Sequence, residues 1–336
     1  MGDEAAVVAA VDARALAVAL GDVPCAAVGA AVQRHGAPRV GLVLGTSAST
    51  IAVSEQAYRQ GAGDGGFPLP LRHEALNTPH APADFIRRRL GLQGLALTVS
   101  TACSSGAQAI AVAERWLRLG MADAVLAGGL DVLGASLLHG FAALQVLSEP
   151  PCRPFDAARR GISIGEAAAW LLLERGRGAL ELRGHGVASD AHHMSSPHPQ
   201  GLGAEAALDD ALARAAIDAE ALDLVHLHGT GTLANDAVEA ALTARRYRAD
   251  VHACATKGLT GHTMGAAGAL GAVITLAALE RGLRPGSAPT VVPDPALGAG
   301  FAARWRPAPV RRRLCSAASH AFGFGGHNVV LVFAAC

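Results

Sequence analysis

Short apolar runs of strand length alternate with helical patterns in this chain, and that alternation restricts its fold more than any other feature. The runs are continuous in hydrophobicity, as are strands that helices cover on both faces. They include residues 40–44, 95–99, 124–127 and 329–333. The segment 104–119 has helical periodicity and stops at Gly120, and its apolar face consists of Ala107, Ile110, Ala113 and Leu117. The alternation predicts an α/β fold built in layers.

The chain divides into two halves of similar design. In the first half an apolar run ends at a turn that carries a cysteine, and a helical pattern follows. In the second half the run 224–227 leads into a Gly-rich turn and then into the helical pattern 236–246. The Arg-Gly-Arg-Gly sequence at 175–178 interrupts the pattern between them. We therefore expect an N-terminal half at residues 1–178 and a C-terminal half at residues 179–336.

Size and charge exclude several classes of protein. A chain of 336 residues is long enough to bury a large core. Its formal net charge is zero, so no overall charge attracts nucleic acid or an anionic membrane. The acidic first residues lack the basic region and apolar run of a secretory signal, and the apolar stretches elsewhere are broken by glycine or charge. We expect a soluble, cytoplasmic protein with no nucleic-acid partner and no membrane insertion.

One of the six cysteines stands where a nucleophile is expected. The cysteines show no CxxC pair and no regular spacing, which argues against a disulfide framework and against a zinc site. Cys103 lies in the segment 100–106, where an apolar strand turns into a helix. Backbone N–H groups and the positive end of the helix dipole at such an elbow lower the pKa of a thiol. Cys103 is a candidate nucleophile, and the alternative is a buried structural cysteine.

The basic residues include one exceptional position. Of the 28 Lys and Arg residues, Lys257 is the single lysine. An ammonium is a compact charge that fits tight sites and responds to burial, whereas a guanidinium is a planar fork. Lys257 lies five residues before His262 in a Gly-rich stretch, and His228 opens a second turn rich in glycine and threonine, with Glu239 on the helix that follows. Each histidine alone is compatible with a core role, but the combination with Cys103 favours a catalytic site.

Five motifs in order resemble the elongating β-ketoacyl-acyl carrier protein synthases, which are condensing enzymes of the thiolase fold. The motifs are Thr-Ala-Cys-Ser-Ser at 101–105, Phe-Asp-x-x-Arg-x-Gly at 155–161, His-Gly-Thr-Gly-Thr at 228–232, Thr-Lys-Gly-Leu-Thr-Gly-His at 256–262 with Gly-Ala-Ala-Gly after it, and Gly-Phe-Gly-Gly-His-Asn at 323–328. The resemblance runs from about residue 40 to the C-terminus. It implies a thiolase-like α/β fold of five layers, α-β-α-β-α, with two pseudo-symmetric halves and a site at their junction.

The resemblance also implies a reaction, the decarboxylative Claisen condensation that lengthens an acyl chain by two carbons. Cys103 is implied to take the acyl group from the thioester of a carrier protein. His228 and His262 are implied to stabilise the enolate that forms when a malonyl thioester loses carbon dioxide, since two donors aimed at its oxygen act as an oxyanion site. No metal or organic cofactor is needed. Lys257 is implied to support the histidines electrostatically, and Glu239 to be a structural carboxylate in the same network.

Further site residues and the partners follow from the same resemblance. The backbone N–H groups of Cys103 and Phe324 are implied to form a second oxyanion hole, with Phe324 also acting as a movable gate to the acyl pocket. Thr230 and Thr232 are implied to support the site from the turn beside His228. The expected partners are an acyl carrier protein bearing malonyl and acyl thioesters and a second subunit. That subunit is either the same chain or a related ketosynthase-like chain, bound through the strand before Cys103.

The chain also departs from the family pattern. The family usually begins with a strand and a helical region that we expect to be absent here, so either Ala5–Val11 substitutes for that strand or a partner covers the sheet edge. His320 and Ala321 stand where Asn-Ser is common, and Asn235 and His327 replace the commoner Gly and Thr. These changes border the Cys-His-His core and bear on the substrate more than on the reaction. By similarity, the Ser-Ser-Pro-His segment at 195–198 and the shortened N-terminus favour a specialised lipid of the aryl polyene type.

Three alternatives remain open at this point. The His-rich segment 190–198 favours a loop over the mouth of the active site more than a metal site, because no carboxylate or cysteine stands at ligand spacing. A partner subunit of the same fold, a chain-length factor, typically loses the nucleophile, which this chain keeps. A Cys-His hydrolase needs a single base oriented by a carboxylate or amide, and two histidines with Lys257 fit that pattern poorly.

Overall fold

The computed structural model of the protein describes residues 5–11, 22–49, 51–61 and 78–335. The frame of the described molecule is a 10-stranded sheet of order β3-β2-β4-β5-β1-β6-β12-β11-β7-β8. The strands of the first half are β1 (Ala5–Val11), β2 (Val40–Gly45), β3 (Ala96–Val99), β4 (Ala124–Asp131) and β5 (Ala167–Arg175). Those of the second half are β6 (Leu180–Ser189), β7 (Leu224–His226), β8 (His252–Cys254), β11 (Ser316–Gly323) and β12 (His327–Ala335). A separate short ribbon pairs β9 (Leu283–Arg284) with β10 (Val310–Arg311).

The two halves of the sheet repeat one topology. The order β3-β2-β4-β5-β1 in the first half corresponds, strand for strand, to β8-β7-β11-β12-β6 in the second. In each half the two pairings around the second strand are parallel and the next two pairings are antiparallel. The predicted pseudo-symmetric halves are therefore confirmed. Ala5–Val11 forms β1 in the place that β6 occupies in the other half, so the first alternative for the N-terminus holds.

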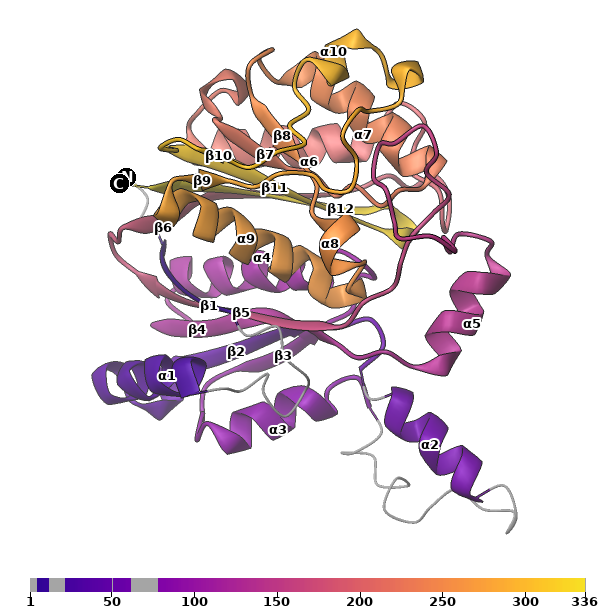
Figure 1. The fold of residues 1–336 in the computed structure, drawn as a ribbon. Coiled ribbons are helices and arrows are strands. Elements are labelled where there is room, and N and C mark those ends of the chain that lie inside the picture. The colour runs from indigo at the N-terminus through magenta and orange to yellow at the C-terminus, as the bar shows by residue number, and fades with distance from the viewer. Residues whose placement is uncertain (1–4, 12–21, 50, 62–77, 336) are drawn as a thin grey trace.

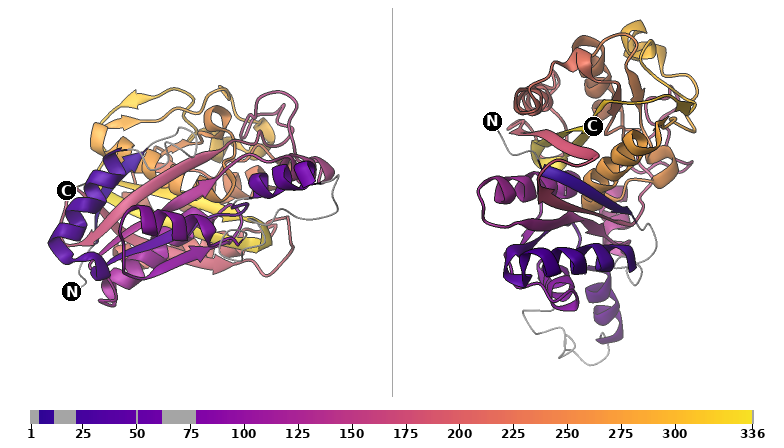
Figure 2. Two further views of the ribbon diagram at one scale, coloured as in Figure 1. Left: turned by 90° about the horizontal axis from the view of Figure 1, so that it is seen from below. Right: turned by 90° about the vertical axis from the view of Figure 1, so that its left-hand side faces the viewer.

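Helices divide the sheet into layers. The first half contributes α1 (Asp22–His35), α2 (Ile51–Gly61), α3 (Ala81–Arg89), α4 (Ser105–Arg118) and α5 (Ala135–Ala143). The second half contributes α6 (Leu202–Ala215), α7 (Leu233–Arg246), α8 (Lys257–Thr260), α9 (Ala267–Arg281) and α10 (Ala299–Ala302). Strands β1 and β6 pair over only two residues, and the sheet folds over there so that its halves lie on either side of α4 and α9 (Figures 1 and 2). Outer helices cover the far faces, which gives the predicted five layers.

The central layer holds the largest apolar core. The predicted inner face of α4, formed by Ala107, Ile110, Ala113 and Leu117, is buried there against α9 and both sheet halves. The N-terminal turns of the two helices meet at reciprocal glycines. A Cβ on Gly106 would lie 2.8 Å from the backbone nitrogen of Ala269, and one on Gly268 would lie 2.8 Å from that of Ala107. Only glycine permits this approach, and it places the start of α4 beside the start of α9.

The sequence-based strands are confirmed with one difference in burial. Strands β2 and β4 are buried along their whole length, as expected for strands covered on both faces. Strand β3 is not, because it lies at the edge of the sheet, and Leu97 keeps 38% of its surface exposed. Among the described residues one helical stretch, Met264–Arg281, is long and apolar enough to cross a membrane, but 72% of it is buried. Its place between the two sheet halves is that of a core helix.

Candidate active site

Cys103 occupies the predicted elbow between β3 and α4. The preceding residue, Ala102, has a φ of 50°, a left-handed conformation that costs a non-glycine residue free energy. The hydroxyl of Ser105 donates to the Ala102 carbonyl at 2.6 Å, and that of Ser104 donates to the Thr101 carbonyl at 2.8 Å. These local bonds hold the turn in place. Cys103 is buried and lines a cavity between the two halves of the sheet.

The pKa of the Cys103 thiol differs from the sequence-based expectation. The backbone N–H groups of Phe324 and Cys103 and the charge of Lys257 lower it, but burial outweighs them and raises the pKa to about 11. The predicted lowering of the pKa at the elbow is therefore wrong, because removing water from around a thiolate destabilises it more than the local dipoles stabilise it. The free thiol is protonated at neutral pH. The backbone N–H groups of Phe324 and Cys103 are both directed at the Cys103 sulfur.

The two histidines of the second half lie together in the same cavity. His228 follows β7 and His262 follows α8, and each keeps 3% of its surface exposed. Their ring centroids are 5.5 Å apart and the rings are nearly perpendicular, at 85°. Both line the cavity that Cys103 also lines. The contact between the starts of α4 and α9 explains why residues from opposite halves converge.

The contacts assign the same tautomer to both imidazoles. The Nδ1 atom of His262 accepts the backbone N–H of Met264 at 3.2 Å, so the ring proton is on Nε2. The ammonium of Lys257 lies 3.3 Å from Nδ1 of His228 and also donates to the carbonyl of that residue, which leaves the proton of His228 on Nε2. Burial first, then the charge of Lys257, holds the pKa of each ring well below its usual range. Each histidine is thus a neutral Nε2–H donor.

Glu239 and Lys257 lie behind the cavity wall. The Glu239 carboxylate on α7 is fully buried and accepts the backbone N–H groups of His228 at 2.7 Å and Gly229 at 2.8 Å. Gly229 has a φ of 46°, and a Cβ there would lie 2.6 Å from that of Ala255, so the turn requires glycine. Burial is the main cause that lowers the pKa of Lys257, and the charge of Glu239 opposes it. Both residues position His228 instead of lining the cavity.

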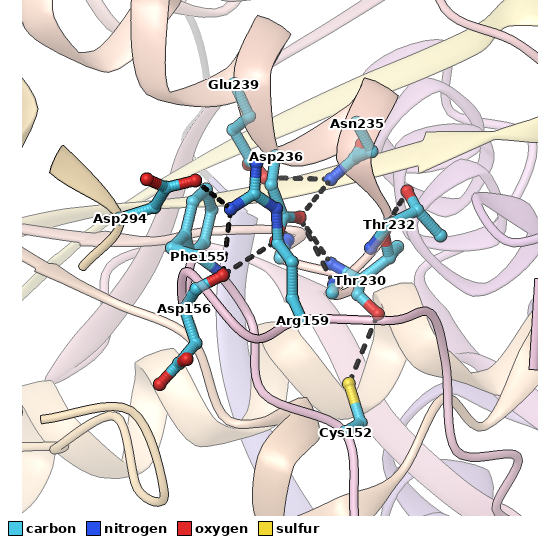
Figure 3. A network of polar contacts seen from close by, with 12 residues as sticks. Cys152, Phe155, Asp156, Arg159, Thr230, Thr232, Asn235, Asp236, Glu239 and Asp294 are labelled. Atoms are coloured by element: carbon cyan, nitrogen blue, oxygen red, sulfur yellow. Dashed lines mark hydrogen bonds and ion pairs between the residues drawn. The ribbon is translucent and has the colours of Figure 1, made fainter. Parts of the chain in front are cut away.

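A second carboxylate beneath the same turn was missed by the sequence reasoning. Asp236 accepts the backbone N–H groups of Phe155 at 2.6 Å, Thr230 at 3.1 Å and Gly231 at 3.2 Å, and burial raises its pKa to about 6. Arg159 lies 3.8 Å from Asp236 and 2.7 Å from Asp294. Figure 3 shows Arg159 between the two carboxylates. An available signal was the Asp-x-x-Glu spacing on the first turns of α7, which puts both carboxylates on one helix face.

Asp131, at the end of β4, was also missed. Its carboxylate accepts the hydroxyls of Thr46 and Ser47, each at 2.6 Å, and the backbone N–H of Gly265, also at 2.6 Å. Gly265 lies three residues after His262, so Asp131 ties the loop after β2 in the first half to the histidine turn in the second. The signal for it was an acidic residue closing an apolar run.

The cavity has a volume of 530 Å³. Besides the thiol and the imidazoles, Thr230 and Thr232 line it, with their hydroxyls 2.9 Å apart. The ring of Phe324 also lines it and stacks on Phe141 with 6.0 Å between centroids. The segment 190–198 contributes wall residues, as predicted for a loop over the mouth. The described residues contain no group of three or more His, Cys, Asp or Glu side chains that could hold a metal.

Comparison with known proteins agrees with this arrangement. The N-terminal domain model of the β-ketoacyl synthases matches residues 24–179, and the C-terminal domain model matches residues 179–290. Nodulation protein E of Rhizobium leguminosarum bv. trifolii is 34% identical over 317 residues, covering 91% of this chain and 78% of that protein. The 3-oxoacyl-(acyl-carrier-protein) synthase 2 of Vibrio cholerae is 31% identical over 331 residues, with the same two coverages of 91% and 78%.

Solved structures give the same result. A ketosynthase in complex with its chain length factor from Xenorhabdus doucetiae superposes with a TM-score of 0.85 at 34% identity, covering 97% of this chain and 85% of that one. A β-ketoacyl synthase from Burkholderia phymatum superposes with a TM-score of 0.81 at 30% identity, covering 89% and 76%. The predicted thiolase-like fold and the carbon–carbon bond-forming acyltransferase class are thereby confirmed. The chain belongs to the β-ketoacyl synthase family.

Proposed function

We propose that Cys103, His228 and His262 carry out the decarboxylative condensation of the β-ketoacyl synthases in this chain. One observation supports this most directly: a thiol from the first half and two neutral imidazole donors from the second half line a single cavity. A thiol is a nucleophile for acyl groups, and paired N–H donors stabilise an oxyanion.

The first step is transfer of the acyl group to Cys103. The sulfur attacks the carbonyl of an acyl-carrier thioester, the bond between that carbonyl and the carrier sulfur breaks, and the thiol proton leaves with the carrier sulfur. The backbone N–H groups of Cys103 and Phe324 stabilise the oxyanion of the tetrahedral intermediate. Because the resting thiol is protonated, acyl transfer is faster if a group accepts the thiol proton while the bond between sulfur and the acyl carbon forms. The carrier sulfur becomes that acceptor.

The second step joins the two chains. A malonyl-carrier thioester loses carbon dioxide, and the negative charge moves to its thioester oxygen. The Nε2–H groups of His228 and His262 donate to that oxygen. Because both rings are neutral, they form no ion pair with the malonyl carboxylate and so do not stabilise the substrate before it loses carbon dioxide. The enolate carbon then attacks the acyl-Cys103 thioester, the bond to sulfur breaks, and the thiolate takes up a proton. The product is a 3-oxoacyl thioester longer by two carbons.

Partners and context belong to the same proposal. The substrates are carried by an acyl carrier protein, and a ketosynthase-like subunit pairs with β3, either the same chain or a related one. The related structure that contains a chain length factor supports the second form. A cytoplasmic location, a product of the aryl polyene type and a boundary at residues 178 and 179 between the halves complete the proposal.

A reconstituted assay tests the reaction. Purified protein, alone and together with a co-expressed related subunit, is given acyl-carrier and malonyl-carrier thioesters, and the 3-oxoacyl product is measured by mass spectrometry. We expect product with the wild type and none with Cys103→Ala. Release of free fatty acid without the malonyl donor would instead indicate a hydrolase.

The remaining candidate function is a non-catalytic chain-length factor. It is favoured only by the related complex, which contains such a subunit. If this chain has that role, Cys103→Ala leaves turnover of the assembled complex unchanged.

A further inference from the structure

His320, on β11, lies inside the protein behind the catalytic cavity, with 3% of its surface exposed. Its Nδ1 atom is 3.0 Å from Oε1 of Glu239, and its Nε2 atom is 2.7 Å from the hydroxyl of Tyr247. His320 therefore connects the carboxylate beneath the His228 turn to a second buried polar group. The mechanism above uses neither His320 nor Tyr247.

The contacts determine which way each hydrogen bond runs. Burial raises the pKa of Tyr247 well above its usual range, so the phenol keeps its proton and donates to Nε2 of His320. The ring proton is then on Nδ1, which donates to the Glu239 carboxylate. The same Oε1 atom accepts the backbone N–H of His228 at 2.7 Å. The bonds run in one direction from Tyr247 through His320 to Glu239.

We propose that His320 is a positioning residue for decarboxylation, which holds the Glu239 carboxylate beneath the His228 turn and so aims the Nε2–H of His228 at the enolate oxygen. This inference rests on the proposed function. Without the donor on His320, one oxygen of a buried carboxylate keeps a single partner at close distance, and Glu239 gains freedom to turn away from the His228 backbone.

Packing gives His320 a second path to the same histidine. The ring of Phe322 lies 5.2 Å from that of His320 and 5.8 Å from that of His228, so Phe322 fills the space between them. The orientation of the His320 ring therefore affects the position of Phe322, which packs beside His228 in the cavity wall. No contact of this kind connects His320 to Cys103 among the described residues, and the two half-reactions should respond differently.

Two amide variants separate the bonds of His320. In His320→Asn the amide nitrogen takes the place of Nδ1 and still donates toward Glu239, whereas in His320→Gln the amide nitrogen takes the place of Nε2 near Tyr247. Both variants stay polar and similar in size. We measure decarboxylation of a malonyl-carrier thioester and, separately, acyl transfer to Cys103 by intact-protein mass spectrometry. Thermal melting of each variant reports folding.

We expect His320→Gln to lower the decarboxylation rate by about 10- to 100-fold, His320→Asn by less than about fivefold, and both to transfer acyl groups within about threefold of the wild type. The matched control is His252→Gln, which removes another buried histidine whose Nε2 bonds the Pro285 carbonyl at 2.6 Å; it should leave both half-reactions unchanged. The inference is overturned if both half-reactions fall together, if Asn is no better than Gln, or if neither variant changes decarboxylation. A wild type that performs neither half-reaction, either alone or with the co-expressed related subunit, refutes the proposed function itself.

Discussion

The two edge strands of the sheet, β3 in the first half and β8 in the second, occupy equivalent positions, but their outer edges differ in backbone hydrogen bonding. The outer edge of β8 is closed within the chain, because the N–H of Ala253 donates to the Arg304 carbonyl and the N–H of Arg306 donates to the Ala253 carbonyl, each at 3.0 Å. In the part of the chain that the structure describes, no backbone group bonds the outer edge of β3. Leu97 on that strand is 38% exposed.

The two halves therefore share one strand topology, but only the second half has the hydrogen bonds that close its edge strand. The second half, which carries the imidazoles, closes its edge and holds its turns with buried carboxylates. The first half, which carries the thiol, keeps an open edge strand that leads directly into Cys103, and an open edge readily pairs with another strand. The open edge of β3 supports the proposal that a partner subunit pairs with the first half, whereas the second half closes its edge within the chain.

The largest effect is expected from the first half. Cys103→Ala removes the nucleophile and should lower product formation at least about 1,000-fold. Cys254→Ala, at the end of the equivalent strand β8, removes a buried sulfur that lies in the core and should keep turnover within a few fold. The rate of 3-oxoacyl product formation distinguishes the two variants. If both variants lose activity equally, Cys103 has no special role as a nucleophile.

The second half should fail in only one of the two steps. His228→Ala or His262→Ala removes one donor to the enolate oxygen, which is expected to lower decarboxylation about 100- to 1,000-fold. Acyl transfer to Cys103 should persist in both variants. Radiolabelled carbon dioxide release and intact mass report the two steps separately. Loss of acyl transfer in the histidine variants would contradict the division of labour between the halves.

Asp236 tests how firmly the second half holds its turns. Burial raises its pKa from 3.8 to about 6, so between those values the folded state keeps a proton that the unfolded state has lost. Its contribution to the free energy of unfolding therefore falls as the pH rises from about 4 to 6. Asp236→Asn should lower that free energy by roughly 1 to 3 kcal/mol and remove this part of the pH dependence. Urea unfolding at pH 4.5 and 7 measures the free energy of unfolding of both proteins. If this free energy changes with pH equally in the wild type and in Asp236→Asn, the raised pKa of Asp236 is contradicted.

The smallest effect is expected at the open edge. Leu97→Lys places a charge on β3 and should weaken subunit association about tenfold, because a charge on an edge strand opposes pairing. Val310→Lys, on the exposed two-stranded ribbon, is the control and should change nothing. Sedimentation velocity gives the dissociation constants. If Leu97→Lys associates as the wild type does, the partner binds elsewhere.

Much of this arrangement could be predicted from the sequence, and the reasons are local. Continuous apolar runs mark buried strands, and the spacing of Ala107, Ile110 and Leu117 marks the inner face of α4. Gly-rich turns mark His228 and His262 as candidates, and their combination with Cys103 and Lys257 favours a catalytic role. These features depend on residues that are near one another in the chain, so the sequence pattern is enough to predict them.

The rest depends on tertiary packing. The thiol pKa is set by how much water the folded protein removes from Cys103, and the elbow alone predicts the wrong direction. Asp131 and Asp236 act through backbone groups that are distant in sequence, and His320 appears as a family departure until its contacts to Glu239 and Tyr247 are seen. The exposure of β3 follows from its place at the sheet edge, which an apolar run does not reveal.

The most direct test follows the acyl group itself. Wild-type protein, together with the related subunit if the isolated chain is inactive, is incubated with an acyl-carrier thioester alone, and the modified peptide is identified by mass spectrometry. We predict one acyl group on Cys103 that is consumed when the malonyl thioester is added, and that persists unconsumed when His228 or His262 is replaced by alanine. An acyl group on Cys152 or another residue, or none at all, would contradict the assignment of the thiol and the imidazoles to one site.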